Sequence, residues 1–216
     1  MSTRASATTD PTRYHHGDLR RALLDSAGAI LSETGRWDFS LREVARRAGV
    51  SHNAPYRHFP DKEALLCAIG VAGYDALHAH SMAAVKRTST PAETLKALGQ
   101  AYIEFGVSNP ALYRLMFGQG LPNISGLPPA LMEAVNAARA VLREAILAGA
   151  RTRAFTVNPE DADEVRAAAV AAWSLVHGFT LLTIDRVVER EIGPGVVQDL
   201  AGQVAARFIV GLTPKR

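Results

Sequence analysis

Apolar residues recur every three or four positions along most of the chain, and no segment shows the sustained alternation that is typical of a β-strand. The first clear helix is predicted over residues 18–34, with Asp18 as its N-terminal cap and Gly35 as its end. Its inward face is predicted to consist of Leu19, Leu23, Ala27, Ile30 and Leu31. The whole pattern predicts an all-α protein of about nine helices.

Start and stop signals divide the rest of the chain into further helices. Thr90-Pro91-Ala92-Glu93 and Asn158-Pro159-Glu160 each combine a capping residue, a proline for the first helical turn and an acidic residue. Ser108-Asn109-Pro110 and Gly193-Pro194-Gly195 are predicted breaks, because both interrupt the helical spacing with proline. A long connection is expected from Gly118 to Pro129.

Residues 167–184 carry no formally charged side chain, and an uncharged run of this length can indicate a membrane span. The run also contains Ser174 and His177, and charged residues close it on both sides without a positive-inside bias. A helix buried on most sides, by its own domain and by a second subunit, explains the pattern better. We therefore expect no membrane segment. Together with a final helix over residues 196–212, this helix is expected to form a four-helix dimer interface.

Composition and charge narrow the class of protein. The 216-residue chain contains one cysteine, which excludes a disulfide-stapled scaffold and a cysteine-rich zinc site. The start of the chain lacks the apolar segment of a signal peptide, so a cytoplasmic protein is expected. The net charge of +3 falls entirely in residues 1–60, where nine arginines face six acidic residues. This asymmetry indicates an anionic partner for the N-terminal part.

A helix-turn-helix pattern lies between residues 40 and 59. Ser40 and Glu43 are placed to form a capping box at the start of a short helix. Gly49 can adopt the left-handed conformation that ends this helix in a tight turn, and Ser51 can cap a second helix. Basic and amide side chains on the second helix are typical of a DNA-binding helix-turn-helix. The alternative is an ordinary helical hairpin whose arginines are solvated.

Residues 14–69 resemble the DNA-binding domain of the TetR (tetracycline repressor) family, above all in the pattern Val50-Ser51-x-x-x-x-Tyr56-x-His58-Phe59-x-x-Lys62-Glu63-x-Leu65. The resemblance implies an all-helical homodimer whose three N-terminal helices bind double-stranded operator DNA and whose larger C-terminal domain binds a small-molecule effector. The expected domains are a flexible arm (1–13), a helix-turn-helix domain (14–70) and a ligand-binding and dimerisation domain (71–216). Arg4 and Arg13 of the arm either enter the minor groove or belong to an inert tail.

A narrower group within this family is marked by a tryptophan and a His-Gly pair, and this chain resembles it at Trp173, His177 and Gly178. The opening segment over residues 14–20 is similar to that group as well. Pro55 departs from the broader family pattern, and it would remove an early backbone hydrogen bond from the recognition helix. We therefore expect that helix to be short or distorted.

The resemblance implies roles for individual residues at the DNA. His52 and Asn53 lie at the start of the recognition helix, where side chains reach base edges in the major groove, and asparagine can pair with adenine through two hydrogen bonds. Arg42 shares a face of the preceding helix with Arg46, so one of them can reach the DNA backbone. The positions that usually contact phosphates in the family are Ser40, Ser51, Tyr56, His58 and Lys62.

The effector site is expected around Trp173 and His177, which lie one helical turn apart and share a face. His177 either lines a ligand pocket or is a buried histidine satisfied by a backbone carbonyl. Residues around the Asn109-Pro110 break form either a pocket wall or ordinary core: Tyr102, Phe105, Tyr113, Met116 and Phe117. To affect DNA binding, the pocket must touch elements that move the helix predicted over residues 61–87.

Two other functions compete with a ligand-responsive regulator. A helical enzyme is disfavoured, because the sequence has no Gly-rich phosphate loop, no His-x-x-x-His pair and no nucleophile elbow. An effector-independent dimeric DNA-binding protein would need far fewer residues than follow Thr90. We therefore predict a dimeric, ligand-responsive transcriptional regulator, a repressor by resemblance, without catalytic residues, metal ligands or cofactors.

Overall fold

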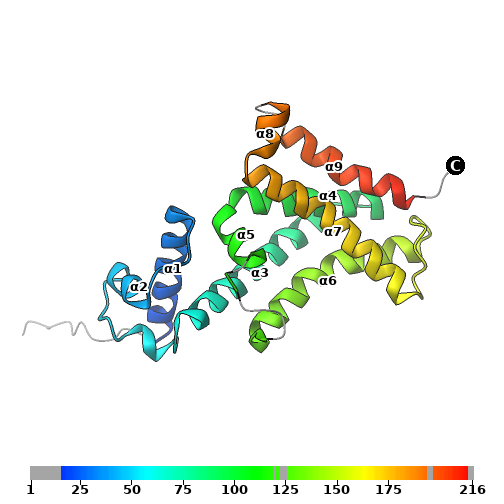
Figure 1. Ribbon diagram of the computed structural model, residues 1–216. Helices are drawn as coiled ribbons and strands as arrows, with labels where there is room; N and C mark the ends of the chain where they lie inside the picture. Colours follow the sequence, from blue (N-terminus) through cyan, green and yellow to red (C-terminus); the bar gives the residue numbers. More distant parts are fainter. Residues whose placement is uncertain (1–15, 119, 122–125, 194–196, 214–216) are drawn as a thin grey trace, which may run out of the picture. The chain divides into compact units, whose positions relative to one another are not determined.

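The computed structural model describes residues 16–118, 120–121, 126–193 and 197–213. All regular secondary structure in these ranges is helical (Figure 1), which confirms the predicted all-α class. The elements are α1 (His16–Thr34), α2 (Leu41–Arg47), the short 3-10 helix η1 (Pro55–Arg57), α3 (Lys62–Val85), α4 (Pro91–Ser108), α5 (Pro110–Phe117), α6 (Pro129–Arg151), α7 (Ala162–Ile184), α8 (Val187–Ile192) and α9 (Val197–Leu212). The arm predicted over residues 1–13, with Arg4 and Arg13, lies outside the described residues, as do Pro194 and Gly195 of the predicted break.

The chain divides into two compact units within α3, between Leu65 and Leu66. The N-terminal unit contains α1, α2, η1 and the first turn of α3. The C-terminal unit contains the rest of α3 and the helices from α4 to α9. Each unit is described by itself below.

Helix α1 supplies the main apolar face of the N-terminal unit and packs against α2. Leu19 at the start of this face is half-buried. The predicted cap at Asp18 is wrong, because α1 begins at His16 and Asp18 lies within its first turn. The other four residues of the predicted inward face are buried, as expected: Leu23, Ala27, Ile30 and Leu31.

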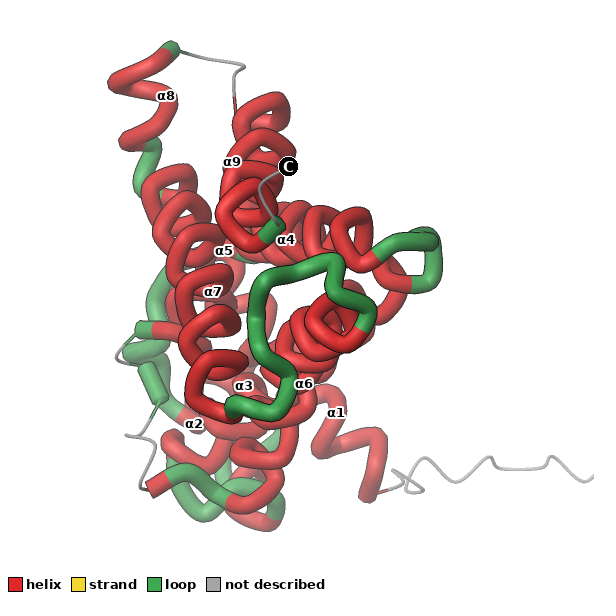
Figure 2. The backbone as a smooth tube through the Cα atoms, turned by 90° about the vertical axis from the view of Figure 1, so that its right-hand side faces the viewer, coloured by secondary structure: helices red, strands yellow, loops and turns green. Residues whose placement is uncertain are grey.

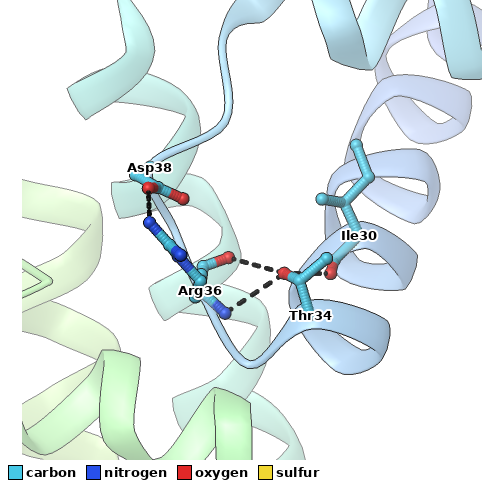
Figure 3. Close-up of polar contacts among 4 residues, drawn as sticks. All are labelled: Ile30, Thr34, Arg36 and Asp38. Carbon is cyan, nitrogen blue, oxygen red and sulfur yellow. Dashed lines mark hydrogen bonds and ion pairs between the residues drawn. The ribbon is translucent and has the colours of Figure 1, made fainter.

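Local contacts hold the connection from α1 to α2 (Figure 3). The hydroxyl of Thr34 donates to the carbonyl oxygen of Ile30 at 2.8 Å and accepts the backbone N–H of Arg36 at 3.2 Å. Gly35 ends α1 in the left-handed region, with φ +67°, as predicted. The Arg36 guanidinium pairs with the Asp38 carboxylate, and this hydrogen bond holds the pKa of Asp38 below its ordinary value. These contacts, all among residues 30–38, therefore hold the chain in the segment that leads into α2.

The two predicted proline-containing helix starts have different outcomes. Thr90 caps α4 with a complete capping box: its hydroxyl accepts the Glu93 N–H at 3.2 Å, and the Glu93 carboxylate accepts the Thr90 N–H at 3.0 Å. The start predicted at Asn158 is wrong. Residues 158–160 form a turn instead, and α7 begins three residues later, where the Asp161 carboxylate accepts the N–H groups of Asp163 and Glu164.

The C-terminal unit is built around α4, which packs against α6, α7 and α9 (Figure 2). Helix α7 packs in turn against α6, α8 and α9. Glycine permits one of the closest approaches, because a Cβ at Gly106 of α4 would lie 2.3 Å from Thr180 of α7 and 2.9 Å from Tyr113 of α5. The break predicted at residues 108–110 is confirmed, since α4 ends at Ser108 and α5 begins at Pro110.

Helix α7 contains the uncharged run noted in the sequence. Among the described helices it alone has the length and mean hydropathy of a membrane span, and 17% of its most apolar window is buried. It also packs against four other helices of its own unit. The apolar side chains it leaves exposed include Val170, Leu175 and Leu182. Val210 of the neighbouring α9 is 72% exposed.

Candidate functional site

The first helix of the predicted helix-turn-helix begins and ends as the sequence indicates. The hydroxyl of Ser40 accepts the backbone N–H of Glu43 at 3.1 Å, which is the Ser40 half of the predicted capping box. Gly49 adopts φ +69° after the helix. The N–H of Val50 then reaches back to the carbonyl of Ala45 at 3.0 Å, and the N–H of Gly49 reaches Arg46 at 3.3 Å. This pair of bonds is the Schellman motif, in which the left-handed residue lets the chain reverse tightly.

The recognition segment differs from the α-helix predicted to begin at Ser51. The N–H of Ala54 bonds to the carbonyl of Ser51 at 2.9 Å, and a single 3-10 turn follows from Pro55 to Arg57. The physical reason is Pro55, which has no N–H to offer to the carbonyl four residues earlier. Pro55 is also fully buried, so its ring is part of the core of the unit. The expected shortening of this helix is therefore confirmed.

Most of the side chains predicted to contact DNA are exposed in the N-terminal unit. Tyr56 is 49% exposed. His58 and Lys62 are half-buried, and Lys62 is the first residue of α3. The remaining predicted residues are exposed and lie between the N-cap of α2 and the turn after that helix: Ser40, Arg42, Ser51, His52 and Asn53.

Two further arginines of this unit have distinct environments. Arg47 on α2 forms a two-pronged ion pair with Glu33 on α1, in which one nitrogen–oxygen pair lies at 2.7 Å. This hydrogen bonding holds the pKa of Glu33 below its ordinary value. Arg57, in contrast, is exposed on η1 beside Tyr56. Sequence reasoning missed Arg57, although it is the arginine nearest in sequence to the predicted base-reading positions His52 and Asn53.

In the C-terminal unit, five of the seven predicted effector residues form one aromatic cluster: Tyr102, Tyr113, Phe117, Trp173 and His177. The indole N–H of Trp173 donates to the Tyr102 hydroxyl at 2.9 Å, and the Tyr102 and Tyr113 hydroxyls lie 3.0 Å apart. The Tyr113 hydroxyl lies 2.6 Å from Nδ1 of His177, and the Tyr102 hydroxyl lies 3.1 Å from the same atom. The polar partners of His177 are thus tyrosine hydroxyls rather than a backbone carbonyl.

Burial keeps this cluster uncharged. It lowers the pKa of His177 and raises the pKa of Tyr113 to about 12. The pKa of Tyr102 is raised even further, first by burial and then by the neighbouring Tyr113. A neutral histidine can accept a hydrogen bond at Nδ1, which suits a tyrosine hydroxyl as the donor. The cluster is therefore a hydrogen-bonded network of neutral groups at ordinary pH.

A cavity of about 960 Å³ lies beside the aromatic cluster, at the upper end of the range for small-molecule sites. Tyr102, Phe117 and Trp173 line it. The other four predicted effector residues are not among its lining residues. Phe105, Tyr113 and Met116 belong to a buried core together with Tyr74 and Leu77, and His177 packs against the rings of Tyr113, Phe117 and Trp173.

Helix α3 also contributes to the cavity, through Tyr74, Leu77 and Ser81. The Tyr74 hydroxyl donates to the backbone carbonyl of Met116 at 3.0 Å, which ties α3 to α5. Both α3 and the segment over residues 102–117 therefore contact the same cavity. Helix α3 is the helix predicted over residues 61–87, which an effector must move to affect DNA binding.

Two family models match the chain. The model described as "Bacterial regulatory proteins, tetR family" matches residues 23–69, and the model described as "Tetracyclin repressor-like, C-terminal domain" matches residues 95–198. The chain belongs to the TetR family. As a TetR-family protein it is a DNA-binding transcriptional regulator and not an enzyme, as the sequence predicted.

Two solved structures share the fold of this chain over 89–94% of its length. A Rhodococcus sp. RHA1 protein of unknown function is 30% identical, with a TM-score of 0.79 over 94% of this chain and 100% of that one. The transcriptional regulator FadR from Bacillus subtilis, solved in complex with stearoyl-CoA, is 16% identical and shares the fold, with a TM-score of 0.68 over 89% of this chain and 98% of that one.

Among relatives of known function, the nucleoid occlusion factor SlmA of Actinobacillus pleuropneumoniae is 32% identical over 94 residues. That alignment covers 44% of this chain and 46% of SlmA. The TetR-family chain therefore matches about half of the length of this relative. This similarity agrees with the family assignment and does not extend to the activity of SlmA.

Sequence reasoning missed most of the residues that line the cavity of this TetR-family protein. The lining includes four arginines that no sequence motif indicated: Arg139, Arg143, Arg151 and Arg166. The first three lie on α6, where Arg139 and Arg143 are about one helical turn apart and share a face, and Arg151 lies about two turns further along. This spacing was the available signal, but a charged row on a helix usually marks a solvated face.

Proposed function

We propose that this TetR-family regulator binds a pseudo-palindromic operator as a homodimer in the cytoplasm and is released from it by a small, mainly apolar effector. The observation that carries the proposal is the cavity beside Tyr102 and Trp173, which is also lined by Tyr74 and Leu77 of α3. An effector can shift DNA binding only by differing in affinity between two arrangements of the protein. Helix α3 begins at Lys62 in the helix-turn-helix unit, so a ligand that biases α3 also acts on that unit.

The DNA-binding role is assigned to residues 14–70. The exposed His52 and Asn53 are proposed to read base edges, and Arg57 on the 3-10 turn is a further candidate. Backbone phosphates are proposed to be held by Ser40, Arg42, Ser51, Tyr56, His58 and Lys62. The 3-10 turn is only three residues long, so few side chains project from it, and this supports base contacts from a short segment.

The effector and dimerisation roles are assigned to residues 71–216. The cavity walls Tyr102, Phe117 and Trp173 are proposed to contact the effector, and His177 to hold the two tyrosine hydroxyls behind them. Phe105, Tyr113 and Met116 support these walls from the core. FadR, which has the same fold, was solved with stearoyl-CoA, and this supports a small-molecule role for the unit. The Trp and His-Gly pair supports placement in the narrower group of the family.

The homodimer is proposed to form through α7 and α9. The apolar side chains that these helices leave exposed, including Leu175, Leu182 and Val210, support a buried partner face. A second copy of the same pair of helices would complete a four-helix interface with two-fold symmetry. The uncharged run of α7 then faces protein rather than lipid.

Selection from random duplex DNA tests the operator part of this proposal. We expect an enriched palindrome whose half-sites lie about 34–36 Å apart or a multiple of that distance. The affinity for it should fall steeply with salt, because many contacts are to phosphate. Recovery of only asymmetric or non-enriched sequences would refute it.

The effector part is tested by the variant His177→Ala in DNA-release assays with candidate ligands. Loss of the Nδ1 acceptor should loosen the tyrosine hydroxyls and weaken the response to effector more than the affinity for DNA. A folded variant whose response is unchanged would remove His177 from the effector mechanism. Equal losses in stability, DNA affinity and response would assign it to the core alone.

A further inference from the structure

The cavity is long and follows two helices. Its lining residues on α6 run from Asn136 to Arg151, which corresponds to about 22 Å of helix. On α7 they run from Ala162 to Val176, which corresponds to about 21 Å. A cavity between two helices over this length fits an extended chain better than a compact ring system.

The cavity also has an apolar floor and a basic rim. Buried lining residues include Leu77, Leu95, Leu98 and Val165. The charged lining residues are all solvent-exposed and consist of Arg139, Arg143, Arg151, Arg166 and a single acid, Glu160. Residues 61–216 carry no net charge as a whole. The excess of arginine over acid at the rim is therefore local, and it complements an anion.

The two ends of the rim differ in how their arginines are already paired. At the end that contains Arg151, Arg166 pairs with Asp163 at 2.7 Å, and Glu160 adds a further negative charge. That end is close to neutral. Its four charged groups leave no excess positive charge for an anionic ligand.

The other part of the rim keeps its positive charge. Arg139 forms no ion pair with any described residue, and Arg143 lies one helical turn further along the same face. Arg143 pairs with its neighbour Glu144 at 2.9 Å, but both side chains are more than half exposed, so this ion pair is weak and exchangeable. The positive charge of Arg139 also acts on the buried Tyr74 hydroxyl and partly opposes the rise in pKa that burial causes there.

We propose that the effector is a linear amphipathic anion, whose aliphatic chain lies on the apolar floor and whose carboxylate or phosphate head is held by Arg139 with Arg143. Guanidinium groups offer paired N–H donors that match the oxygens of either head group. The chain would lie on the floor beside Leu98 and Trp173. This inference rests on the proposed effector function and adds the chemical class of the ligand.

Titration calorimetry on the full-length protein tests the inference with four ligands that share one chain and are used below their micellar concentrations. The ligands are dodecanoate, dodecyl phosphate, dodecanol and dodecyltrimethylammonium. The two anions should bind at least about tenfold more tightly than the alcohol, and the cation should bind most weakly. Equal affinities for the anions and the alcohol would overturn the proposal, and so would tighter binding of the cation or no binding of either anion.

The variants Arg139→Gln and Arg143→Gln locate the head group. Arg139→Gln should weaken both anions about tenfold and leave the alcohol unchanged. Arg143→Gln should weaken the phosphate more than the carboxylate, because the phosphate presents more charge and more acceptor oxygens. Arg190→Gln is the matched control, since Arg190 also pairs with its neighbour, Glu191, at 3.3 Å but lies on α8 outside the lining. An effect of Arg190→Gln equal to that of Arg139→Gln, or no effect of Arg139→Gln, would refute the site.

DNA release, measured with the same ligands, separates this inference from the proposed function. Anions that bind through Arg139 and displace operator DNA support both. Anions that bind through Arg139 without changing DNA affinity leave the binding site in place and refute the release function. Displacement by dodecanol as efficiently as by the anions would support an apolar effector and overturn the anionic one.

Discussion

The two units of this TetR-family protein assemble their functional groups in different ways. In the N-terminal unit, the candidate DNA-contact residues lie between Ser40 and Lys62 in sequence, and helix caps and turns present them. In the C-terminal unit, the aromatic cluster joins Tyr102 and Tyr113 to His177, which is 75 and 64 residues away in sequence. The first kind of site depends on local backbone geometry, and the second depends on the packing of distant helices. Substituting an exposed contact residue of the N-terminal unit should therefore affect DNA binding more than stability. Substituting a buried residue of the aromatic cluster should mainly lower the stability.

The largest effect is expected at Tyr113, whose side chain is completely buried. Tyr113→Ala should lower the free energy of unfolding by about 3–5 kcal/mol, because it leaves a cavity in the core and removes a hydroxyl from the network. Tyr56→Ala is the matched control in the other unit, where the ring is 49% exposed. It should change the free energy of unfolding by only about 0.5 kcal/mol while weakening DNA binding. Denaturant unfolding measures the free energy of unfolding of both variants. Similar losses of stability in the two variants would contradict the difference between the units.

A smaller effect is expected at the turn of the helix-turn-helix. Gly49→Ala should cost about 1–2 kcal/mol, because φ +69° is unfavourable for a residue with a Cβ. Gly28→Ala in α1 is the control, since a Cβ there meets nothing within 4 Å. It should stabilise the helix by about 0.5–1 kcal/mol. Thermal unfolding of the two variants tests this, and a neutral Gly49→Ala would contradict the role of the left-handed turn.

The roles within the DNA-contact surface should separate in binding assays. Asn53→Ala should relax the preference at one base position by about 1–3 kcal/mol. Lys62→Ala should weaken binding to all sequences almost equally and make the salt dependence shallower by about one unit. Affinities for operator variants at several salt concentrations distinguish these outcomes. A uniform loss in both variants would show that Asn53 does not read a base.

The smallest effect is a pH dependence of the C-terminal unit. Burial lowers the pKa of His177, so the unfolded chain binds a proton more readily than the folded chain. The stability linked to His177 is complete above the ordinary histidine pKa of about 6.5, and it is lost as the pH falls through the lower folded value. In His177→Gln, the free energy of unfolding should change less between about pH 7.5 and 5 than in the wild type. An identical pH dependence would refute a desolvated His177.

Sequence reasoning succeeded where a short segment determines its own structure. The Thr90 capping box and the turn at Gly49 were predicted because all their partners lie within a few residues. The same logic failed at Asn158, where a second capping residue, Asp161, lies three positions further along and takes the cap instead. After Ser51, the proline at position 55 correctly predicted a shortened recognition helix, although not that the segment would be a single 3-10 turn.

For the candidate effector site, sequence reasoning indicated the residues of the aromatic cluster but not the shape of the cavity beside it. Trp173 and His177 were found because they share a helical face, and Tyr102 and Tyr113 because they flank a break. Which of these side chains line the cavity depends on how α4, α6 and α7 pack, and no local pattern contains that information. The arginine row of α6 was overlooked for the same reason, since only its neighbours distinguish a rim from a solvated face.

The break at residues 108–110 has a consequence for how the family can vary in length here. In one continuous helix, Tyr102 and Tyr113 would be separated by about 16 Å along the axis, whereas the break brings their hydroxyls to 3.0 Å. Inserting or deleting a single residue within α4 after Tyr102 would rotate the following backbone by about 100° and separate the two hydroxyls. Exposed positions such as Glu104 and Val107 can change identity without that effect. Evolution at this segment is therefore expected to exchange residues freely at the surface while conserving their number.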